Sequence, residues 1–189
     1  MMAQQSVTLD NLRVCSYNMH GYNNGRPLLE SLCHTHDVIL VQEHWLPSCD
    51  LHKLKTINEQ FNCYGISAMV EKLSSGILVG RPFGGVAILW RNDLSNYIKI
   101  ADSDCDRYVA IQICINSICK LVIHCVYFPC NSNCQDYILE ASNIISKIEL
   151  NLNYYSCSSH ILAGDFNYDC VDEIVGYDLF KSVISNNTV

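Results

Sequence analysis

The sequence predicts a single α/β domain, and three observations support this prediction. Hydrophobic residues make up 49% of the 189-residue chain, which is enough for one substantial core. Residues 37–43 are almost continuously apolar, as in a strand buried on both faces. Residues 135–150 instead repeat apolar side chains at intervals of three and four, as on one helix face. No internal repeat or linker divides the chain.

The first half of the chain alternates strands and helices. A short apolar stretch ends in polar Asn18, and three leucines at helical spacing follow it before the long apolar strand. Asp50 can cap a further helix, and the loops at residues 74–76 and 81–84 lie between two extended segments. The expected strands cover residues 13–17, 37–43, 63–69 and 85–90, and the expected helices cover residues 26–34 and 50–58.

The second half predicts a hairpin, a long helix and a last short strand. Residues 107–115 and 118–127 are rich in β-branched residues, and Asn116 and Ser117 between them suit a two-residue hairpin turn. The helix over residues 135–150 leads into a strand over residues 160–163. We treat residues 1–12 as a polar extension and residues 13–189 as the domain.

The net charge, the distribution of apolar residues and the cysteines limit the classes of protein that we expect. The net charge of −7 argues against nucleic-acid binding through a broad basic surface, although a metal-bridged contact to phosphate remains compatible with it. The N-terminus lacks a signal-peptide pattern and no stretch is apolar enough to span a bilayer, so we expect an intracellular protein without membrane contact. The 12 cysteines are scattered through apolar segments, which favours reduced, buried thiols.

Several polar residues share one position, at the point where an apolar strand ends and a loop begins. Because strand ends are rigid platforms in layered folds, we expect these side chains to converge on one pocket. The residues are Asn18, Glu43, Tyr127 with Asn131 beyond it, and Asp165 with Asn167.

These side chains have the chemistry of metal-assisted hydrolysis. Glu43 is a hard oxygen ligand that suits Mg²⁺, and Asp165 can orient or deprotonate a water. Asn18 and Asn167 can hold phosphate oxygens without adding charge, and Tyr127 can donate to a developing oxyanion.

The same segments carry a resemblance to the endonuclease/exonuclease/phosphatase superfamily, and more narrowly to the endonuclease domain of non-LTR (LINE-type) retrotransposons. Each motif alone is weak, and their order along residues 14–180 makes the signal. The motifs are residues 16–21 (Ser-Tyr-Asn-Met-His-Gly), 41–45 (Val-Gln-Glu-His-Trp), 84–90 (Gly-Gly-Val-Ala-Ile-Leu-Trp), 106–108 (Asp-Arg-Tyr), 126–129 (Val-Tyr-Phe-Pro) and 162–167 (Leu-Ala-Gly-Asp-Phe-Asn).

The resemblance implies a four-layer α/β/β/α sandwich and a DNA-nicking site. It implies that Glu43, with Asn18 beside it, binds Mg²⁺, or Mn²⁺ in its place. It also implies that Tyr127 contacts the phosphate and Asp165 positions the attacking water, with Asn167 stabilising the transition state. Arg107 and Asn131 would shape the site or touch the DNA strand. A larger retroelement polyprotein with a reverse transcriptase, acting in the nucleus, is the implied context.

The family pattern continues beyond Gly-Asp-x-Asn with further strands and a closing Ser-Asp-His. No histidine follows Asn167 here, so we expect the C-terminal strands to be missing and the chain as given to be inactive. The alternatives are a non-catalytic remnant that serves as a binding module, or a phosphatase of the same superfamily. Zinc and calcium sites are not expected, and strand alternation directs His44 away from the pocket.

Overall fold

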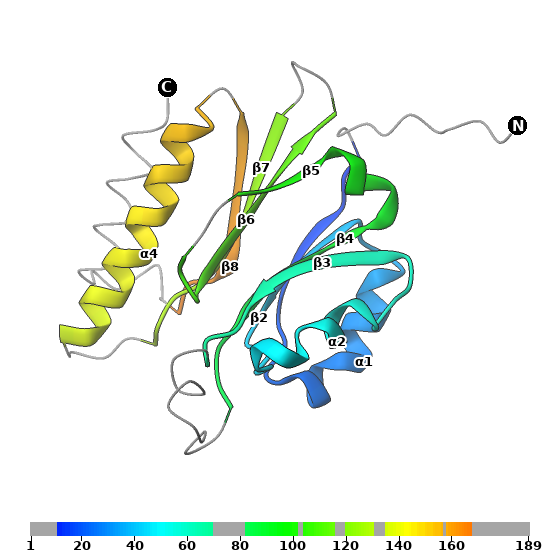
Figure 1. Ribbon diagram of the computed structural model, residues 1–189, viewed down its shortest axis with the longest axis horizontal. Coiled ribbons are helices and arrows are strands. Elements are labelled where there is room, and N and C mark those ends of the chain that lie inside the picture. The colour runs from blue at the N-terminus through cyan, green and yellow to red at the C-terminus, as the bar shows by residue number, and fades with distance from the viewer. Residues whose placement is uncertain are drawn as a thin grey trace, which may run out of the picture.

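A computed structural model describes residues 11–69, 82–101, 104–115, 120–130, 135–156 and 158–167. It contains two four-stranded sheets, each flanked by helix on its outer side (Figure 1). The first sheet has the order β1-β2-β4-β3 and the second the order β5-β6-β7-β8. The strands of the first sheet are β1 (Val14–Asn18), β2 (Val38–Gln42), β3 (Phe61–Ile66) and β4 (Val86–Arg91). Those of the second are β5 (Ile98–Ala101), β6 (Tyr108–Cys114), β7 (Lys120–Tyr127) and β8 (Ser159–Asp165).

Three layers of apolar side chains hold the expected four-layer α/β/β/α sandwich together. The middle layer joins the two sheets and includes Leu40, Ile88 and Ile111, all fully buried. The helices α1 (Tyr22–Cys33) and α2 (His52–Lys55) cover the first sheet through a second cluster. The helix α4 (Gln135–Tyr154) covers the second sheet through a third. The α/β fold class predicted from the sequence is therefore confirmed.

Each sheet contains one parallel pair of strands, and these pairs position the candidate residues. β1 runs parallel to β2, with Asn18 opposite Gln42 at the last rung, so Glu43 follows directly. β7 runs parallel to β8, with Tyr127 opposite Asp165 at the last rung. Parallel strands end at the same edge, and the two sheets pack face to face, so four strand ends meet.

The structure corrects several predicted boundaries. α1 begins at Tyr22, four residues before the predicted start at Arg26. The predicted helix over residues 50–58 is instead a 3₁₀ turn, η1 (Ser48–Asp50), and the short helix α2. β3 lies two residues earlier at its start than predicted, and α4 continues beyond residue 150 to Tyr154. The 3₁₀ segment η2 (Asn92–Tyr97) and β5 were not predicted.

Contacts with the segment between β1 and α1 explain the early start of α1. The stretch Asn23-Asn24-Gly25 has weak helix propensity, and the sequence prediction did not include it in the helix. Gly25 is nevertheless buried where any larger residue would collide with Met19, and its N–H donates to the Gly21 carbonyl (2.9 Å). Tertiary packing thus overrides local preference at this turn.

The cysteine prediction is partly right. The cysteines in the described segments are free thiols, of which Cys33, Cys105 and Cys125 are buried. Cys49 and Cys130 are exposed, contrary to the expectation of burial, because Cys49 lies in the short 3₁₀ turn η1 and Cys130 in a loop, rather than in strand interiors. The expected hairpin turn at Asn116 and Ser117 lies outside the described residues, as does Asn131. In the described ranges no helix is long and apolar enough to cross a membrane.

Candidate metal and phosphate site

Two loops that follow β1 and β2 run side by side and carry the first half of the site. The Met19 N–H donates to the Gln42 carbonyl and the Gly21 N–H to the Glu43 carbonyl, both at 2.8 Å, so the parallel pairing continues past the strands. His20, Glu43 and Trp45 all have positive φ values, of 51°, 54° and 55°. Side chains of this size rarely adopt that conformation, and such strain is concentrated at functional sites.

Asn18 lies at the centre of the site, between two carboxylates. Its Nδ2 donates to Glu43 Oε1 (2.9 Å) and to Asp165 Oδ2 (2.7 Å). Its Oδ1 accepts the His20 backbone N–H (3.1 Å). Carboxylates only accept and a backbone N–H only donates, so these partners fix the orientation of the amide. The amide thus holds two negative groups from different sheets beside one another.

Glu43 receives donors from several directions. Trp45 Nε1 donates to its Oε2 (3.2 Å), opposite the Asn18 contact. His20 Nδ1 lies 3.6 Å from the same oxygen and forms an ion pair when the ring is protonated. The Tyr127 hydroxyl also donates to Glu43. A carboxylate held by this many donors has a defined orientation at the floor of the site.

Tyr127 keeps its proton at neutral pH. Burial raises the pKa of Tyr127 to about 12, and the charge of Glu43 and the hydrogen bond to it add to the effect, while Arg107 opposes it. The Arg107 guanidinium lies over the Tyr127 ring, with Cζ 5.1 Å from the centroid, and pairs with Glu140 (3.1 Å) on α4. Tyr127 therefore serves as a hydrogen-bond donor, and Arg107 supports its ring.

Asp165 and Asn167 form a turn at the end of β8. The Asn167 N–H donates to Asp165 Oδ1 (3.1 Å), and the Phe128 N–H donates to the Asp165 carbonyl (2.8 Å). The Asn167 side chain turns back, with Nδ2 donating to the Phe128 carbonyl (2.8 Å) and Oδ1 accepting from Cys130 Sγ (3.7 Å). Each Asp165 oxygen carries one donor, so lone pairs remain for a water.

The structure thus brings together five of the predicted site residues and leaves His44 outside, as expected. The His44 ring is fully buried, with Nε2 donating to the Ile66 carbonyl (3.1 Å) and Nδ1 accepting the Leu46 N–H (3.0 Å). Burial lowers its pKa to about 4. The gathered residues are Asn18, Glu43, Tyr127, Asp165 and Asn167.

His20 and Trp45 were not among the residues predicted for the site. Both contact Glu43 directly, and their rings lie 5.4 Å apart at 47°. The sequence feature that could have identified them is their spacing, because each follows a predicted site residue by two positions. That spacing becomes informative only once the two loops are known to run in parallel.

The donor set fits a hard divalent cation such as Mg²⁺. Within the described ranges no group of three or more His, Cys, Asp or Glu side chains that could hold a metal ion is found. Mg²⁺ commonly uses one or two carboxylates and completes its shell with water and substrate phosphate. The Glu43 carboxylate and the second lone pair of Asn18 Oδ1 provide such a partial set.

Solved structures from several organisms share this fold. A 3′ phosphatase, NExo, from Neisseria, bound to product DNA hairpin, superposes with a TM-score of 0.64 at 14% identity over 92% of this chain and 70% of that one. An AP endonuclease from Archaeoglobus fulgidus gives 0.65 at 12% identity over 93% and 70%. The human Nocturnin catalytic domain, with a bound sulfate anion, gives 0.59 at 17% over 90% and 68%. No curated protein matches the chain.

A family model matches residues 15–177, which covers both sheets, α1 and α4, and extends past β8. The matched span includes every residue of the hydrogen-bonded cluster around Asn18. The chain belongs to the endonuclease/exonuclease/phosphatase family.

Proposed function

We propose that the Asn18 cluster is a metal-dependent site for hydrolysis of phosphodiester bonds in DNA. The observation that carries this proposal is the Asn18 amide, which joins the Glu43 and Asp165 carboxylates through bonds of 2.9 and 2.7 Å. Two acidic groups from different sheets in one cluster give the charge that a divalent cation and a phosphate require. Membership of a family of hydrolases supports the same reaction class.

Each residue has a role that follows from its contacts. Glu43 and Asn18 Oδ1 would hold Mg²⁺, which when bound polarises a phosphoryl oxygen. Asp165 has free lone pairs to orient an attacking water and accept its proton. Tyr127, protonated at neutral pH, would turn its single O–H from Glu43 to a phosphate oxygen as negative charge develops there. Asn167 holds the turn that aims Asp165.

DNA as the substrate is supported by resemblance. The sequence contexts of His20 and Trp45 are similar to those of retrotransposon endonucleases, and the Neisseria structure contains product DNA hairpin. We therefore propose a retroelement-derived nicking domain that acts in the nucleus within a larger polyprotein. A phosphatase of the same family would share the cluster, and the choice between the two depends on the substrate.

The second candidate is a non-catalytic binding module, and one observation favours it. The chain has seven histidines, all in described segments, yet none contacts Asp165 or Asn167. A missing acid–base group costs about 10²–10⁴-fold in rate. We therefore propose that the 189-residue chain nicks DNA slowly or not at all.

Two measurements test the proposal. The first is binding of Mn²⁺, followed by its electron paramagnetic resonance, which needs no turnover. We expect Glu43→Gln to abolish binding and the matched variant Glu30→Gln, an exposed carboxylate on α1, to retain it. Equal Mn²⁺ binding by Glu43→Gln would contradict the metal assignment.

The second is nicking of supercoiled plasmid in Mg²⁺, with and without added imidazole. Free imidazole can supply the missing acid–base group, so we expect it to stimulate slow nicking by the wild-type chain and by Glu30→Gln, but not by Glu43→Gln. Rapid nicking without imidazole would refute the claim of low activity. Mn²⁺ binding with no nicking in either condition would favour the binding module.

A further inference from the structure

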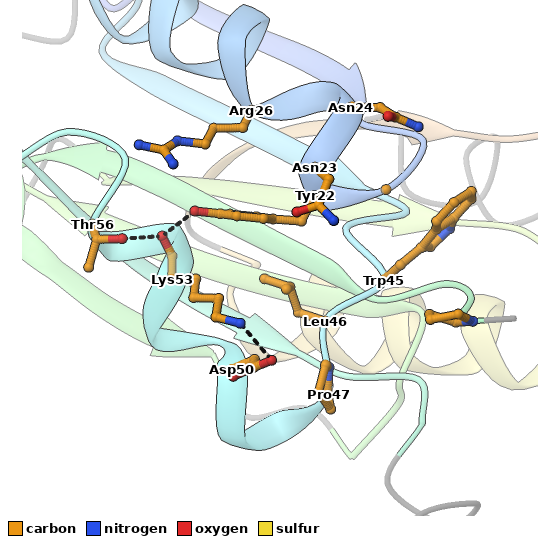
Figure 2. A pocket seen from close by; sticks show the side chains of 12 residues that line it. Tyr22, Asn23, Asn24, Arg26, Trp45, Leu46, Pro47, Asp50, Lys53 and Thr56 are labelled. Atoms are coloured by element: carbon orange, nitrogen blue, oxygen red, sulfur yellow. Dashed lines mark hydrogen bonds and ion pairs between the residues drawn. The ribbon is translucent and has the colours of Figure 1, made fainter. Parts of the chain in front are cut away.

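A pocket lies beside the Asn18 cluster, between the first turn of α1 and the η1–α2 segment (Figure 2). Its volume of about 720 Å³ lies within the range of roughly 300–1,000 Å³ that is common for small-molecule sites. Figure 2 shows the Trp45 indole at one end of the pocket, with Arg26 and Thr56 toward the other. Trp45 therefore belongs to both places, since its Nε1 donates to Glu43.

The Trp45 ring is held in place by contacts along both of its edges. The pyrrole edge donates to Glu43, while the benzo edge packs on Gly21, where an added Cβ would lie 2.5 Å from Cε3. Gly21 has a φ of +92°, so both its backbone and this contact favour glycine. The backbone N–H of Trp45 also donates to the Gly84 carbonyl (3.0 Å). A half-buried indole fixed in this way is a rigid surface for stacking.

The pocket wall on α1 carries polar groups without partners. Asn23, Asn24 and Arg26 are exposed, and no hydrogen bond or ion pair to their side chains occurs within the described part of the chain. The other hydrogen-bonding side chains of the pocket, Tyr22 on α1 and those of the η1–α2 wall, already have partners. Tyr22 and Thr56 both donate to the Lys53 carbonyl, at 3.2 and 2.8 Å, and Lys53 pairs with Asp50.

We propose that this pocket binds one unpaired nucleotide of the strand being cut, with its base stacked on Trp45 and its phosphate paired with Arg26. Asn23 and Asn24 would then face the edge of the base, where amides can both donate and accept. The inference rests on the proposed function, because that function puts the scissile phosphate at Glu43, one side chain away from the pocket.

The composition of the pocket favours an unpaired nucleotide over other ligands. A flat aromatic surface, free amides and one unpaired cation match a base, its polar edge and one phosphate. A base within a duplex is covered on both faces and paired along its edge, so it offers no free surface to an indole in a pocket. The chain has a net charge of −7, so a local unpaired arginine also restricts where a phosphate can bind.

Tryptophan fluorescence in EDTA, where no metal-dependent cutting occurs, tests the stacking. The chain has two tryptophans, and Trp90 is buried with its Nε1 bonded to Ser95 (3.1 Å), so quenching by a base reports on Trp45. We expect a short single-stranded DNA to quench the wild type, and a duplex or an abasic strand of equal length to quench far less. The same titration with an RNA strand of the same sequence shows whether binding depends on the sugar.

Variants separate the stack from the bond to Glu43. Trp45→Phe keeps a ring but loses the Nε1 donor, whereas Trp45→Leu loses both. We expect Trp45→Leu to weaken binding of single strands about 5- to 150-fold, the contribution of one base stack, and Trp45→Phe to weaken it less. Equal losses in both variants, or quenching by the abasic strand equal to that by the normal strand, would overturn the inference.

Arg26→Ala and Lys55→Ala form a matched pair, because both remove an exposed cation and only Arg26 lines the pocket. We expect Arg26→Ala to reduce the slope of log Kd against log salt by about 0.7, the value for one phosphate contact with a single strand, and Lys55→Ala to leave it unchanged. Equal slopes for the two variants would overturn the phosphate contact. Glu43-dependent nicking without base-dependent quenching would refute this inference alone, whereas failure of Mn²⁺ binding would refute the proposed function.

Discussion

Acid should destabilise the second sheet, because His124 is buried there as a neutral ring. The Tyr108 hydroxyl lies 2.8 Å from its Nδ1, and its Nε2 lies 3.0 Å from His160 Nδ1. His160 Nε2 lies 3.2 Å from the Tyr155 carbonyl, which can only accept. His160 must therefore donate from Nε2 and accept at Nδ1, so His124 donates from Nε2 and accepts the Tyr108 proton. A proton added at His124 Nδ1 would disrupt this chain of hydrogen bonds, because the Tyr108 hydroxyl would have to turn from donor to acceptor.

The size of the effect follows from the pKa of His124. Burial, together with the neighbouring His160, lowers this pKa from 6.5 to about 3. The unfolded chain takes up a proton as the pH falls through 6.5, while the folded chain does not until about pH 3. The stability contribution is thus complete above pH 6.5 and is lost between these two values. At pH 5 this effect lowers the free energy of unfolding by about 2 kcal/mol.

Urea unfolding of the wild type and of His124→Gln, at about pH 7.5 and about pH 5, measures this loss. The wild type should lose about 2 kcal/mol more than His124→Gln between the two pH values. Any constant cost of the substitution cancels, because each variant is compared with itself. His34→Gln, an exposed histidine after α1, should behave as the wild type. The same pH dependence in His124→Gln and the wild type would refute the reasoning.

Two further predictions concern the stability of contacts in and beside the first sheet. Gly85→Ala should lower the free energy of unfolding by about 2 kcal/mol or more. The added Cβ would lie 2.3 Å from the His44 ring, and residue 85 has a φ of +86°. A Tm equal to that of the wild type would contradict this. Asp37→Ala should cost about 1–3 kcal/mol in urea unfolding, because the buried carboxylate accepts from both Arg13 and Arg91. Asp93→Ala, which removes the exposed partner of Arg91, should cost less than about 1 kcal/mol, and an equal loss for both would refute this account.

The position of the site could be predicted because a strand end is a local feature of the sequence. An apolar run that stops at a polar residue identified Asn18, Glu43, Tyr127 and Asp165 without knowledge of the pairing. Their convergence followed from the general arrangement of layered α/β folds. The observed basis is more specific, since each sheet supplies one parallel pair whose last rungs lie at the site.

The positive φ angles at His20, Glu43 and Trp45 could not be predicted. They depend on the pairing of the loops after β1 and β2, which joins residues about 20 positions apart in sequence. The prediction of where α1 starts was wrong for a similar reason, since its Asn-Asn-Gly stretch is helical through contacts with β1 and the following loop. Local patterns contain no information on such contacts.

Arg107 is a candidate residue whose role the sequence alone could not decide. The sequence allowed it either to shape the site or to contact a DNA strand. In the structure its charge is paired with Glu140 and its plane covers the Tyr127 ring, so both of its binding modes are already in use. A guanidinium engaged in this way supports Tyr127, which in turn donates to Glu43. Among the described residues that line the neighbouring pocket, the unpaired cation is Arg26, the residue at which the sequence predicted helix α1 to begin.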